Sequence, residues 1–304
     1  MNLDTKWLED FIVLCEVRNF SRAAKARHIT QPAFGRHIKS LEEAVGVQLI
    51  DRSTTPISLT QAGKQFHSLA RNLLMQLDHG LSQLSSQPRP VFTPLRVATP
   101  HSLASPTLMN LMDFASQELS LEYSVDVLRL DYAIESLTEG RSDFLFAFDA
   151  LALHQPPFQN IAIGEGHFYL VSATDHHGAP LFKPGPDNLT PLLRYSPESY
   201  TARLIENALG QPANFPCHPV FESSMCQLHK DMALRGKGVA WLPDCLIEEE
   251  LKERRLIKLS PDVWRIPYKI RLYRNQARLP DIAEAFWQYL QQQAEAGWQL
   301  LPAG

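Results

Sequence analysis

The chain has 304 residues, of which 44% are hydrophobic and 20% charged, and this composition excludes a chain that is disordered, collagen-like or coiled-coil throughout. Its length favours two or three domains over one. The net charge of -4 is unevenly spread, because residues 1–90 hold 11 Lys and Arg against 8 Asp and Glu while the remainder holds 18 against 25. A slightly basic N-terminal part on an acidic body allows nucleic-acid binding at one end.

The sequence also limits where the protein is expected to act. It has no run of about 18 uncharged apolar residues, which a membrane-spanning helix requires, so we expect no membrane partner. Residues 1–11 lack the apolar stretch of a secretory signal. Four cysteines are too few for a disulfide framework. We therefore expect a cytoplasmic protein.

The N-terminal part predicts three short helices. Residues 5–18 carry apolar side chains at helical spacing, and Asn19 is expected to end that helix. Ser21 is expected to cap a second, alanine-rich helix. Thr30 is expected to cap a third helix, which Gly46 ends. The second and third helices are joined by a tight turn, and a small β-structure is expected to follow them.

The third helix places polar side chains opposite its buried stripe. Gln31 and Arg36 belong to the residue types that form bidentate hydrogen bonds with adenine and guanine, and Lys39 suits a phosphate. A helix, a turn and a second helix with donors near its start form the helix-turn-helix layout. Short strands on either side of residues 52–56 predict a wing, from which Arg52 could contact the DNA backbone.

This order of residues resembles the winged helix-turn-helix of the LysR-type transcriptional regulators. The resemblance covers residues 5–64 and is carried by FSRAAKARHITQPAFGRHIKSLEEAVGVQLIDRSTTPISLTQAG. It implies double-stranded operator DNA as a partner, RNA polymerase as a further one, and a homotetramer built as a dimer of dimers. The candidate DNA-binding residues are Ser21, Gln31, Pro32, Ala33, Arg36, Lys39 and Arg52.

Residues 61–86 predict one long linker helix. Its apolar side chains approximate a heptad seam, made of Phe66, Ala70, Leu73, Leu77, Leu81 and Leu84. Polar surroundings favour a seam between two copies, and the alternative is packing on the helix's own domain. In the family that the chain resembles, this helix forms a homodimer. A hinge with two prolines is expected to join it to the body.

From residue 94 onward, strands and helices alternate, which predicts an α/β fold with a mostly parallel sheet. Strands are expected at residues 95–99, 121–130, 143–148, 167–173, 218–221, 238–242 and 266–274, and helices at 106–119, 133–138, 199–209, 223–235, 244–253 and 280–296. The resemblance implies a two-lobed, periplasmic-binding-like effector domain. The predicted division is 1–60 (DNA-binding domain), 61–86 (dimerising linker helix), 87–93 (hinge) and 94–304 (effector domain, with lobe one at 94–164 and 265–304 and lobe two at 165–264).

Segments rich in hydroxyl groups follow several of these strands, and the resemblance brings them to the cleft between the lobes. Ligands of such folds bind beyond the carboxyl ends of strands and at helix N-termini, which favours a small polar or anionic ligand. Ser102, Ser199 and Ser223 are also candidate helix caps, a role compatible with ligand binding. The candidate effector-binding residues are His101, Ser102, Phe148, Tyr195, Ser196, Ser199, Tyr200, Glu222, Ser223, Ser224 and Met225.

The motifs of common enzymes are missing from the sequence. It has no nucleophile elbow, phosphate loop or zinc-protease signature, so we expect no enzyme and no cofactor. Cys217, His218, Cys226 and His229 are potential zinc ligands, but their spacing matches no known finger or ribbon. We therefore expect no metal site.

A closer resemblance is to the hypochlorite-responsive members of the family, carried by TKWLEDFIVLCEVRNFSRAAKARHITQPAFGRHI and ESSMCQLHKDMALRGKGVAWLP. Sensing in that group is attributed to methionine oxidation, and Met225 lies in the matching cleft motif. The alternative is that Met225 and Met232, which share a helical face, fill the core. Cys217 and Cys226 are further redox candidates. Two inputs stay open: an oxidant (hypochlorite or peroxide), as in an oxidative stress response, and a reversibly bound metabolite.

Overall fold

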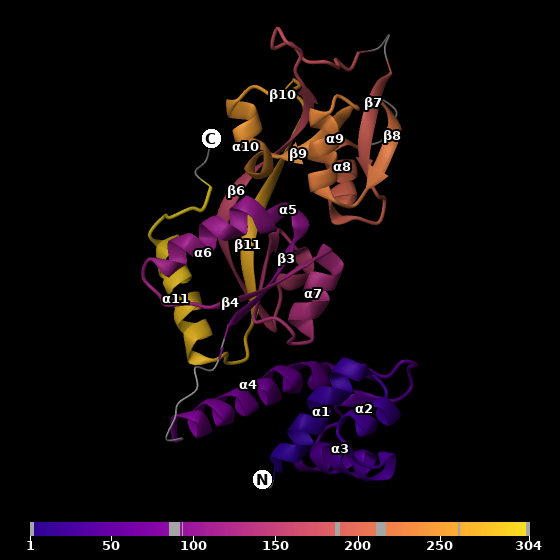
Figure 1. Ribbon diagram of the computed structural model, residues 1–304, viewed down its shortest axis with the longest axis vertical. Helices are drawn as coiled ribbons and strands as arrows, with labels where there is room; N and C mark the ends of the chain where they lie inside the picture. Colours follow the sequence, from indigo (N-terminus) through magenta and orange to yellow (C-terminus); the bar gives the residue numbers. More distant parts are fainter. Residues whose placement is uncertain are drawn as a thin grey trace.

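The computed structural model describes residues 3–84, 92, 94–185, 189–210, 217–260 and 262–301. A small helical head (residues 3–60) lies at one end of an elongated α/β body, and the long helix α4 lies between them (Figure 1). The hinge predicted at residues 87–93 falls outside the described residues apart from Phe92. Among the described residues, no helix is both long enough and apolar enough to cross a membrane.

The head has the predicted three helices and wing: α1 (Thr5–Val17), α2 (Phe20–Ala26), α3 (Gln31–Val45), β1 (Ile50–Asp51) and β2 (Ser58–Leu59). The prediction that Ser21 caps α2 was wrong. Asn19 caps α2 instead, because its Oδ1 accepts a hydrogen bond from Arg22 N at 3.0 Å. Asparagine is as strong a cap as serine, and the earlier start places Phe20 inside the helix, edge-on to Phe34 of α3.

The two ends of α3 follow the predicted capping chemistry. Thr30 Oγ1 accepts a hydrogen bond from Ala33 N at 3.4 Å. Gly46 ends the helix with φ of 80°, a left-handed conformation that costs glycine little. Thr60 caps the next helix, accepting from Gly63 N at 2.9 Å. Local sequence therefore sets both limits of the recognition helix.

Helix α4 (Gln61–Leu84) begins at the head and extends beyond it. The first part of its predicted seam is buried, and residues further along are exposed. Phe66 and Ala70 are buried in the core of the head, where α4 packs on α1, so this half of the seam serves its own domain. Leu73, Leu77 and Leu81 are 40%, 45% and 58% exposed. An uncovered leucine stripe on a long helix is typical of a surface that pairs with another molecule.

One sheet of nine strands runs through both lobes of the body, in the order β4-β3-β5-β11-β6-β9-β7-β8, with β10 paired to β6. The strands are β3 (Leu95–Pro100), β4 (Tyr123–Leu128), β5 (Phe144–Phe148), β6 (Phe158–Ala173), β7 (Thr190–Tyr195), β8 (Cys217–Ser223), β9 (Val239–Pro243), β10 (Leu256–Lys258) and β11 (Arg265–Asn275). In each lobe the outer strands are parallel. The long antiparallel pair β6–β11 joins the lobes, and the predicted lobe boundary at residues 164/165 falls inside β6.

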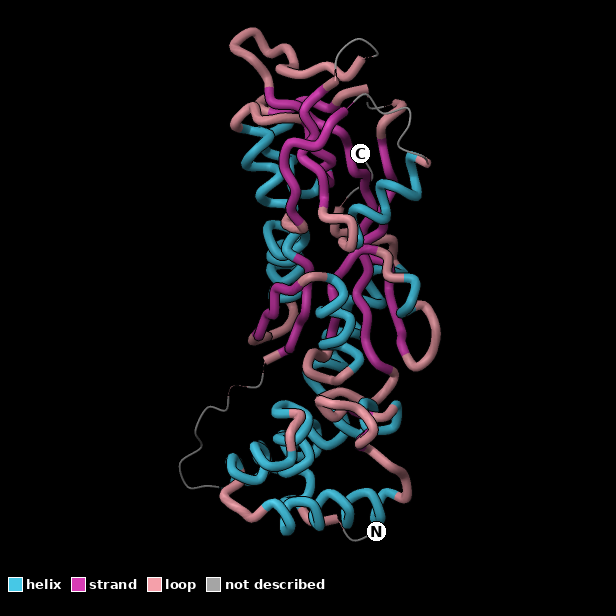
Figure 2. Tube along the Cα trace, turned by 90° about the vertical axis from the view of Figure 1, so that its right-hand side faces the viewer, coloured by secondary structure: helices cyan, strands magenta, loops and turns pink. Residues whose placement is uncertain are grey.

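Helices cover both faces of this sheet (Figure 2). They are α5 (His101–Leu103), the π-helix at Ala104–Leu108, α6 (Met109–Ser116), α7 (Leu130–Thr138), the short 3-10 turn η2 (Leu151–Leu153), α8 (Tyr200–Leu209), α9 (Cys226–Leu234), α10 (Asp244–Lys252) and α11 (Asp281–Glu295). All five residues of β5 are buried: Phe144 and Phe146 face Phe286 of α11, and Leu145 faces Ala133 of α7. A strand buried on both faces explains the apolar run that predicted it.

We predict that Leu73→Asp breaks self-association through α4. A carboxylate in the leucine stripe has to be desolvated whenever a second copy covers it. Sedimentation velocity on the full chain is expected to show a smaller assembly for Leu73→Asp. The matched control is Gln76→Asp, which adds the same charge to an exposed position of α4 outside the stripe. A sedimentation profile of Leu73→Asp identical to wild type contradicts the assignment.

Candidate DNA interface and effector groove

Helix α3 presents its candidate base-reading side chains on the face turned away from its core contacts. Gln31 and Arg36 are exposed, while Phe34 and Ile38 are fully buried. Arg36 makes no ion pair with any described residue, which leaves its guanidinium free for a guanine edge or a phosphate. Ser21 Oγ donates a hydrogen bond to Gln31 Oε1 at 2.9 Å, so the two candidate residues join α2 to α3.

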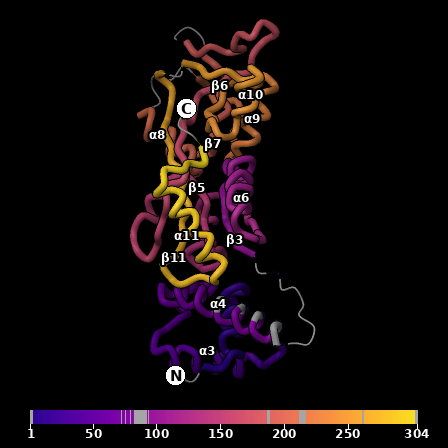
Figure 3. Tube along the Cα trace, turned by 90° about the vertical axis from the view of Figure 1, so that its left-hand side faces the viewer, coloured from indigo at the N-terminus to yellow at the C-terminus, as the bar shows by residue number. Residues whose placement is uncertain are grey.

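The remaining candidates on α3 lie on the same free surface. Pro32 and Lys39 are exposed and Ala33 is half-buried. Lys39 Nζ lies 3.6 Å from Glu43, with both side chains largely exposed, and such a pair contributes little stability. Lys39 can therefore exchange this partner for a phosphate. In Figure 3, α3 lies on the far side of α4 from the body, so the body does not cover it.

Arg52 has a structural role that the sequence did not reveal. Its Nη2 lies 2.8 Å from Oε2 of Glu42, a buried carboxylate that also accepts from Leu49 N and Ile50 N at 2.9 and 3.1 Å. Burial raises the pKa of Glu42, but these hydrogen bonds outweigh burial and hold the pKa below its usual value. Arg52 thus fastens the wing to α3. Its contact with DNA stays a prediction.

A second buried carboxylate orients the recognition helix. Asp10 of α1 is 2% exposed and accepts hydrogen bonds from Arg27 Nε at 2.6 Å and from His37 Nδ1 at 2.7 Å. These partners follow α2 and lie on α3, so a single side chain joins the three helices. Because a buried charge is costly without partners, the arrangement admits few alternative orientations of α3.

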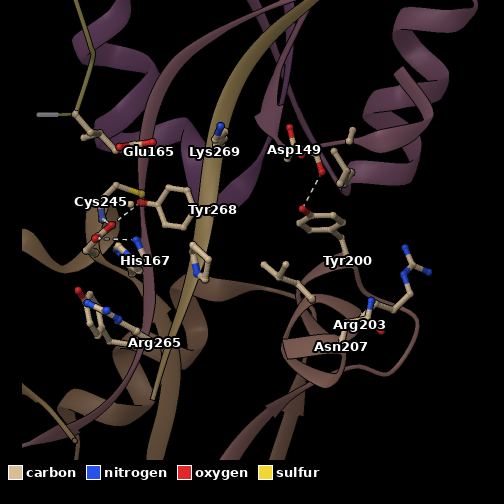
Figure 4. Close-up of a pocket in the computed structure, with 18 of the residues that line it drawn as sticks. Asp149, Glu165, His167, Tyr200, Arg203, Asn207, Cys245, Arg265, Tyr268 and Lys269 are labelled. Carbon is tan, nitrogen blue, oxygen red and sulfur yellow. Dashed lines mark hydrogen bonds between the residues drawn. The ribbon is translucent and has the colours of Figure 1, made fainter. Parts of the chain in front are cut away.

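The body contains a groove of about 1110 Å³ between the lobes, with β6 and β11 as its floor (Figure 4). Lobe one contributes Leu130, Asp131 and Ile134 of α7, and lobe two contributes Tyr200, Arg203 and Asn207 of α8. Tyr200 OH donates to the backbone oxygen of Asp149 at 2.8 Å and so bridges the two lobes. Burial and the nearby carboxylate of Asp149 raise the pKa of Tyr200 to about 12, so it stays a hydroxyl donor.

Four cations line the groove without an ion pair to any described residue: Arg203, Lys258, Arg265 and Lys269. Lys258 Nζ lies over the Tyr169 ring, 3.8 Å from its centroid. Arg265 and Lys269 share one face of β11, whose neighbours on β6 are Tyr169 and Glu165. Asp149, by contrast, is paired with Arg271. Of the groove carboxylates, Asp244 is occupied by the hydroxyl of Tyr268 and by His167 N. The unpaired charge in the groove is mostly positive, which suits an anionic ligand.

Of the candidate effector residues, Tyr200 is the one that lines this groove. Ser199 caps α8 through Ala202 N at 3.1 Å, and Ser223 Oγ accepts from Met225 N at 3.0 Å, so both serines have capping roles. The others are placed as follows: Ser102, Phe148 and Tyr195 are buried, Ser196 and Met225 are half-buried, and His101, Glu222 and Ser224 are exposed. Their binding roles stay predictions. Arg203 and Arg265 were not among the candidate residues, although the charged side chains that alternate along β11 are a signal for one side of the groove.

The thiols are poorly placed for redox chemistry. Burial raises the pKa of Cys217 and of Cys226 to about 12, and the Tyr195 hydroxyl lies 2.9 Å from Cys226 Sγ. Cys217 begins β8 and Cys226 follows its end, so a strand of about 20 Å separates them, which is too long for a disulfide. Burial also raises the pKa of Cys245 to about 12. Among the described residues, no His, Cys, Asp and Glu cluster could hold a metal ion.

Comparisons with known proteins agree with this geometry. The model of the lysR family of bacterial regulatory helix-turn-helix proteins matches residues 5–64, and that of the LysR substrate binding domain matches residues 90–295. The HTH-type transcriptional regulator YjiE of Escherichia coli K12 is 38% identical, over 96% of this chain and 95% of that protein.

Two solved structures extend the likeness. Vibrio fischeri DarR in complex with DNA is 38% identical, with a TM-score of 0.59, over 95% of this chain and 99% of that chain. Full-length HypT of Salmonella typhimurium, a hypochlorite-specific LysR-type transcriptional regulator, is 38% identical, with a TM-score of 0.60, over 97% of this chain and 99% of that chain.

A winged helix-turn-helix with a free recognition face, joined to a two-lobed domain with a groove, defines a DNA-binding regulator of transcription. The chain belongs to the LysR family of transcriptional regulators. It is a regulator and not an enzyme, as are the relatives that it matches.

We predict that Arg36→Ala weakens DNA binding by roughly tenfold to a hundredfold, the effect of losing a bidentate base contact. The probe is a duplex that the wild-type chain selects from a random library, titrated in a gel-shift assay at fixed salt. Lys237→Ala, which removes an exposed charge from lobe two, serves as the control. Equal affinities of Arg36→Ala and wild type contradict the assigned role.

We also predict that native Cys226 and Cys245 resist alkylation by iodoacetamide at pH 8. With a pKa of about 12, only about one thiol in ten thousand is ionised at that pH, and both side chains are buried. Raising the pH increases the thiolate fraction but not the access. Mass spectrometry is expected to find both thiols labelled only after unfolding. Rapid labelling of the native chain contradicts the structure around them.

Proposed function

We propose that this LysR-type regulator responds to an oxidant through the thioether of Met225. The carrying observation is the place of Met225: it is half-buried at the N-terminus of α9, where an oxidant can reach it, whereas Cys226 beside it is fully enclosed. A thioether reacts without losing a proton, so burial does not suppress its chemistry as it does for the thiols. The 38% identity with a hypochlorite-specific regulator supports the proposal.

The chemical step is the transfer of one oxygen atom. The sulfur lone pair of Met225 attacks hypochlorite, the S–O bond forms as the O–Cl bond breaks, and chloride leaves. The resulting sulfoxide is polar and bulkier than the thioether. Met225 N donates to Ser223 Oγ, and Met225 O accepts from Leu228 N at 3.1 Å, so a change at this residue acts where β8 passes into α9.

A second candidate input is an anionic metabolite bound reversibly in the groove. The observation that favours it is the set of unpaired cations, which includes Arg203, Arg265 and Lys269, around a cavity large enough for a small molecule. Such a ligand would contact both lobes and could change their relative orientation. In this case the oxidant would have no effect of its own.

We propose that the active form is a homotetramer in the cytoplasm, with homodimers formed through α4. The exposed stripe of Leu73, Leu77 and Leu81 supports pairing of α4 with a second copy. Two heads on paired linkers would contact two half-sites of an operator, and a change in their spacing would alter the DNA bend. RNA polymerase bound next to such an operator would then be a further partner.

We predict that one equivalent of hypochlorite changes the affinity of the wild-type chain for a selected duplex and that methionine sulfoxide reductase reverses the change. Met225→Leu, of similar volume and without sulfur, is expected to remove the response. Met232→Leu, seven residues further along the same helix, is the matched control and should respond like wild type.

Mass spectrometry of the same samples distinguishes the alternatives. A response that follows oxidation of Met225 supports the proposal. A response in Met225→Leu that follows Cys217 or Cys226 overturns it in favour of a thiol sensor. If Met225 is oxidised and the affinity for DNA does not change, the oxidant is not the input, and the groove becomes the place to search for a ligand.

A further inference from the structure

Helix α7 has one end in the groove and the other against the head. Its N-terminal residues Leu130, Asp131 and Ile134 line the groove. At its C-terminal end, Glu135 and Glu139 lie 3.4 and 2.6 Å from Nη2 of Arg18, the residue that ends α1. Nine residues of helix span about 13 Å, so a short rigid element joins the two places (Figure 1).

The contact between lobe one and the head is close as well as charged. Ser68 and His67 of α4 are 6% and 2% exposed. A methyl group added at Gly140, in the turn after α7, would lie 2.0 Å from Ser68 Oγ, so the two backbones are pressed together here. Gly140 also has a φ of 70°, a backbone conformation that residues with a side chain rarely adopt. The turn is thus shaped to accept α4.

The His67 ring lies buried in this contact. Burial, with the nearby Arg71 guanidinium, lowers the pKa of His67 to about 4, while a hydrogen bond with the Glu139 backbone opposes the shift. The ring is therefore neutral at neutral pH. Its Nδ1 has no hydrogen-bond partner among the described residues. A neutral ring, a serine and a glycine in close contact, flanked by ion pairs of Arg18, form a specific docking surface.

Helix α7 packs on the sheet through the middle of its length. Ala133 and Leu137 are buried against Ala98 and Leu145 of the sheet. At the two ends of the helix, Leu130 and Thr138 are half-buried and Asp131 is exposed. Packed helices slide past their neighbours by small shifts as intact elements. A displacement of the groove end of α7 therefore displaces the Arg18 end.

We infer that α7 couples the groove to the DNA-binding head: occupancy of the groove shifts α7, and its contact with Arg18 and Ser68 carries that shift to α1 and α4. Because α3 faces away from the body, the docked head keeps its recognition face free, and the shift changes the position of the head without masking it. This inference rests on the second input proposed above, a ligand in the groove. Its test uses groove-filling side chains, so coupling and ligand binding can fail separately.

The docking surface is tested by hydrogen exchange of the full chain, followed by mass spectrometry at residues 14–18 and 136–143. Arg18→Glu places three carboxylates together, and Ser68→Gln is too large for the space beside Gly140. Each is expected to speed exchange in both segments on the order of tenfold, while thermal unfolding shows a folded chain. Arg18→Glu combined with Glu139→Arg should restore slow exchange. Lys237→Glu, an exposed charge reversal on lobe two, is the control.

Coupling is tested by filling the groove from its α7 side with Ile134→Phe and Leu130→Phe. Each is expected to change exchange at residues 14–18 of the head at least about threefold, although both positions line the groove. In the Arg18→Glu background this effect should disappear. Tyr132→Gln, on an exposed face of α7 outside the groove, is the control.

Two results would overturn the inference. One is unchanged exchange at residues 14–18 in both groove-filling variants, which would leave the docking surface without a signal to carry. The other is unchanged exchange in both Arg18→Glu and Ser68→Gln, which would mean that the head does not dock. In either case the chain could still bind DNA and respond to an oxidant or a ligand, so the proposed function is tested on its own.

Discussion

Helix α4 contacts different neighbours with different faces of one helix. Phe66 and Ala70 complete the core of the head, and His67 and Ser68 contact lobe one. Further along the helix, Leu73, Leu77 and Leu81 stay exposed. Because each residue turns a helix by about 100°, these faces have fixed angles to one another. A rotation of α4 that improved one contact would spoil the rest. The core of the head, its position against the body and the direction in which a second copy can approach are consequently set together.

Two buried carboxylates join the elements of the head. Asp10 and Glu42 are nearly buried, and each holds two or three donors from different elements. Such networks fix relative orientation, because every donor has one preferred direction, whereas apolar packing of a few small helices tolerates some sliding. In this head the two carboxylates form ion pairs with Arg27 and Arg52. Arg36 on the recognition face makes no ion pair with a described residue, so the arginines that shape the head differ from the one that is placed to contact DNA.

The head could be predicted from sequence because its signals are local: Thr30, Gly46 and the apolar stripe of α3 lie within one short segment. The groove could not, because its walls come from α7, α8, β6 and β11, far apart along the chain. The first half of β6 was missed since Gly164 and Gly166 interrupt its apolar pattern, and Gly166 is required where Asp244 and the Tyr268 hydroxyl approach. The resemblance to the LysR family indicated the serines after β3 and β8 as cleft residues. The packing between the lobes decides which strand ends lie at a cavity, and local sequence does not show that packing.

The sheet that passes without interruption from lobe one to lobe two restricts what an input can do. β6 and β11 are paired from Phe158 to Tyr169 along nearly their whole shared length, with a single irregularity beside Ile270. Both strands run through both lobes, so pulling the lobes apart along the strands would have to stretch backbone that is already extended, whereas a change in strand twist keeps the ladder of hydrogen bonds. The lobes are therefore built to twist relative to one another and not to open about a hinge. A signal would leave the length and overall dimensions of the protein nearly constant and would rotate one lobe about the long axis.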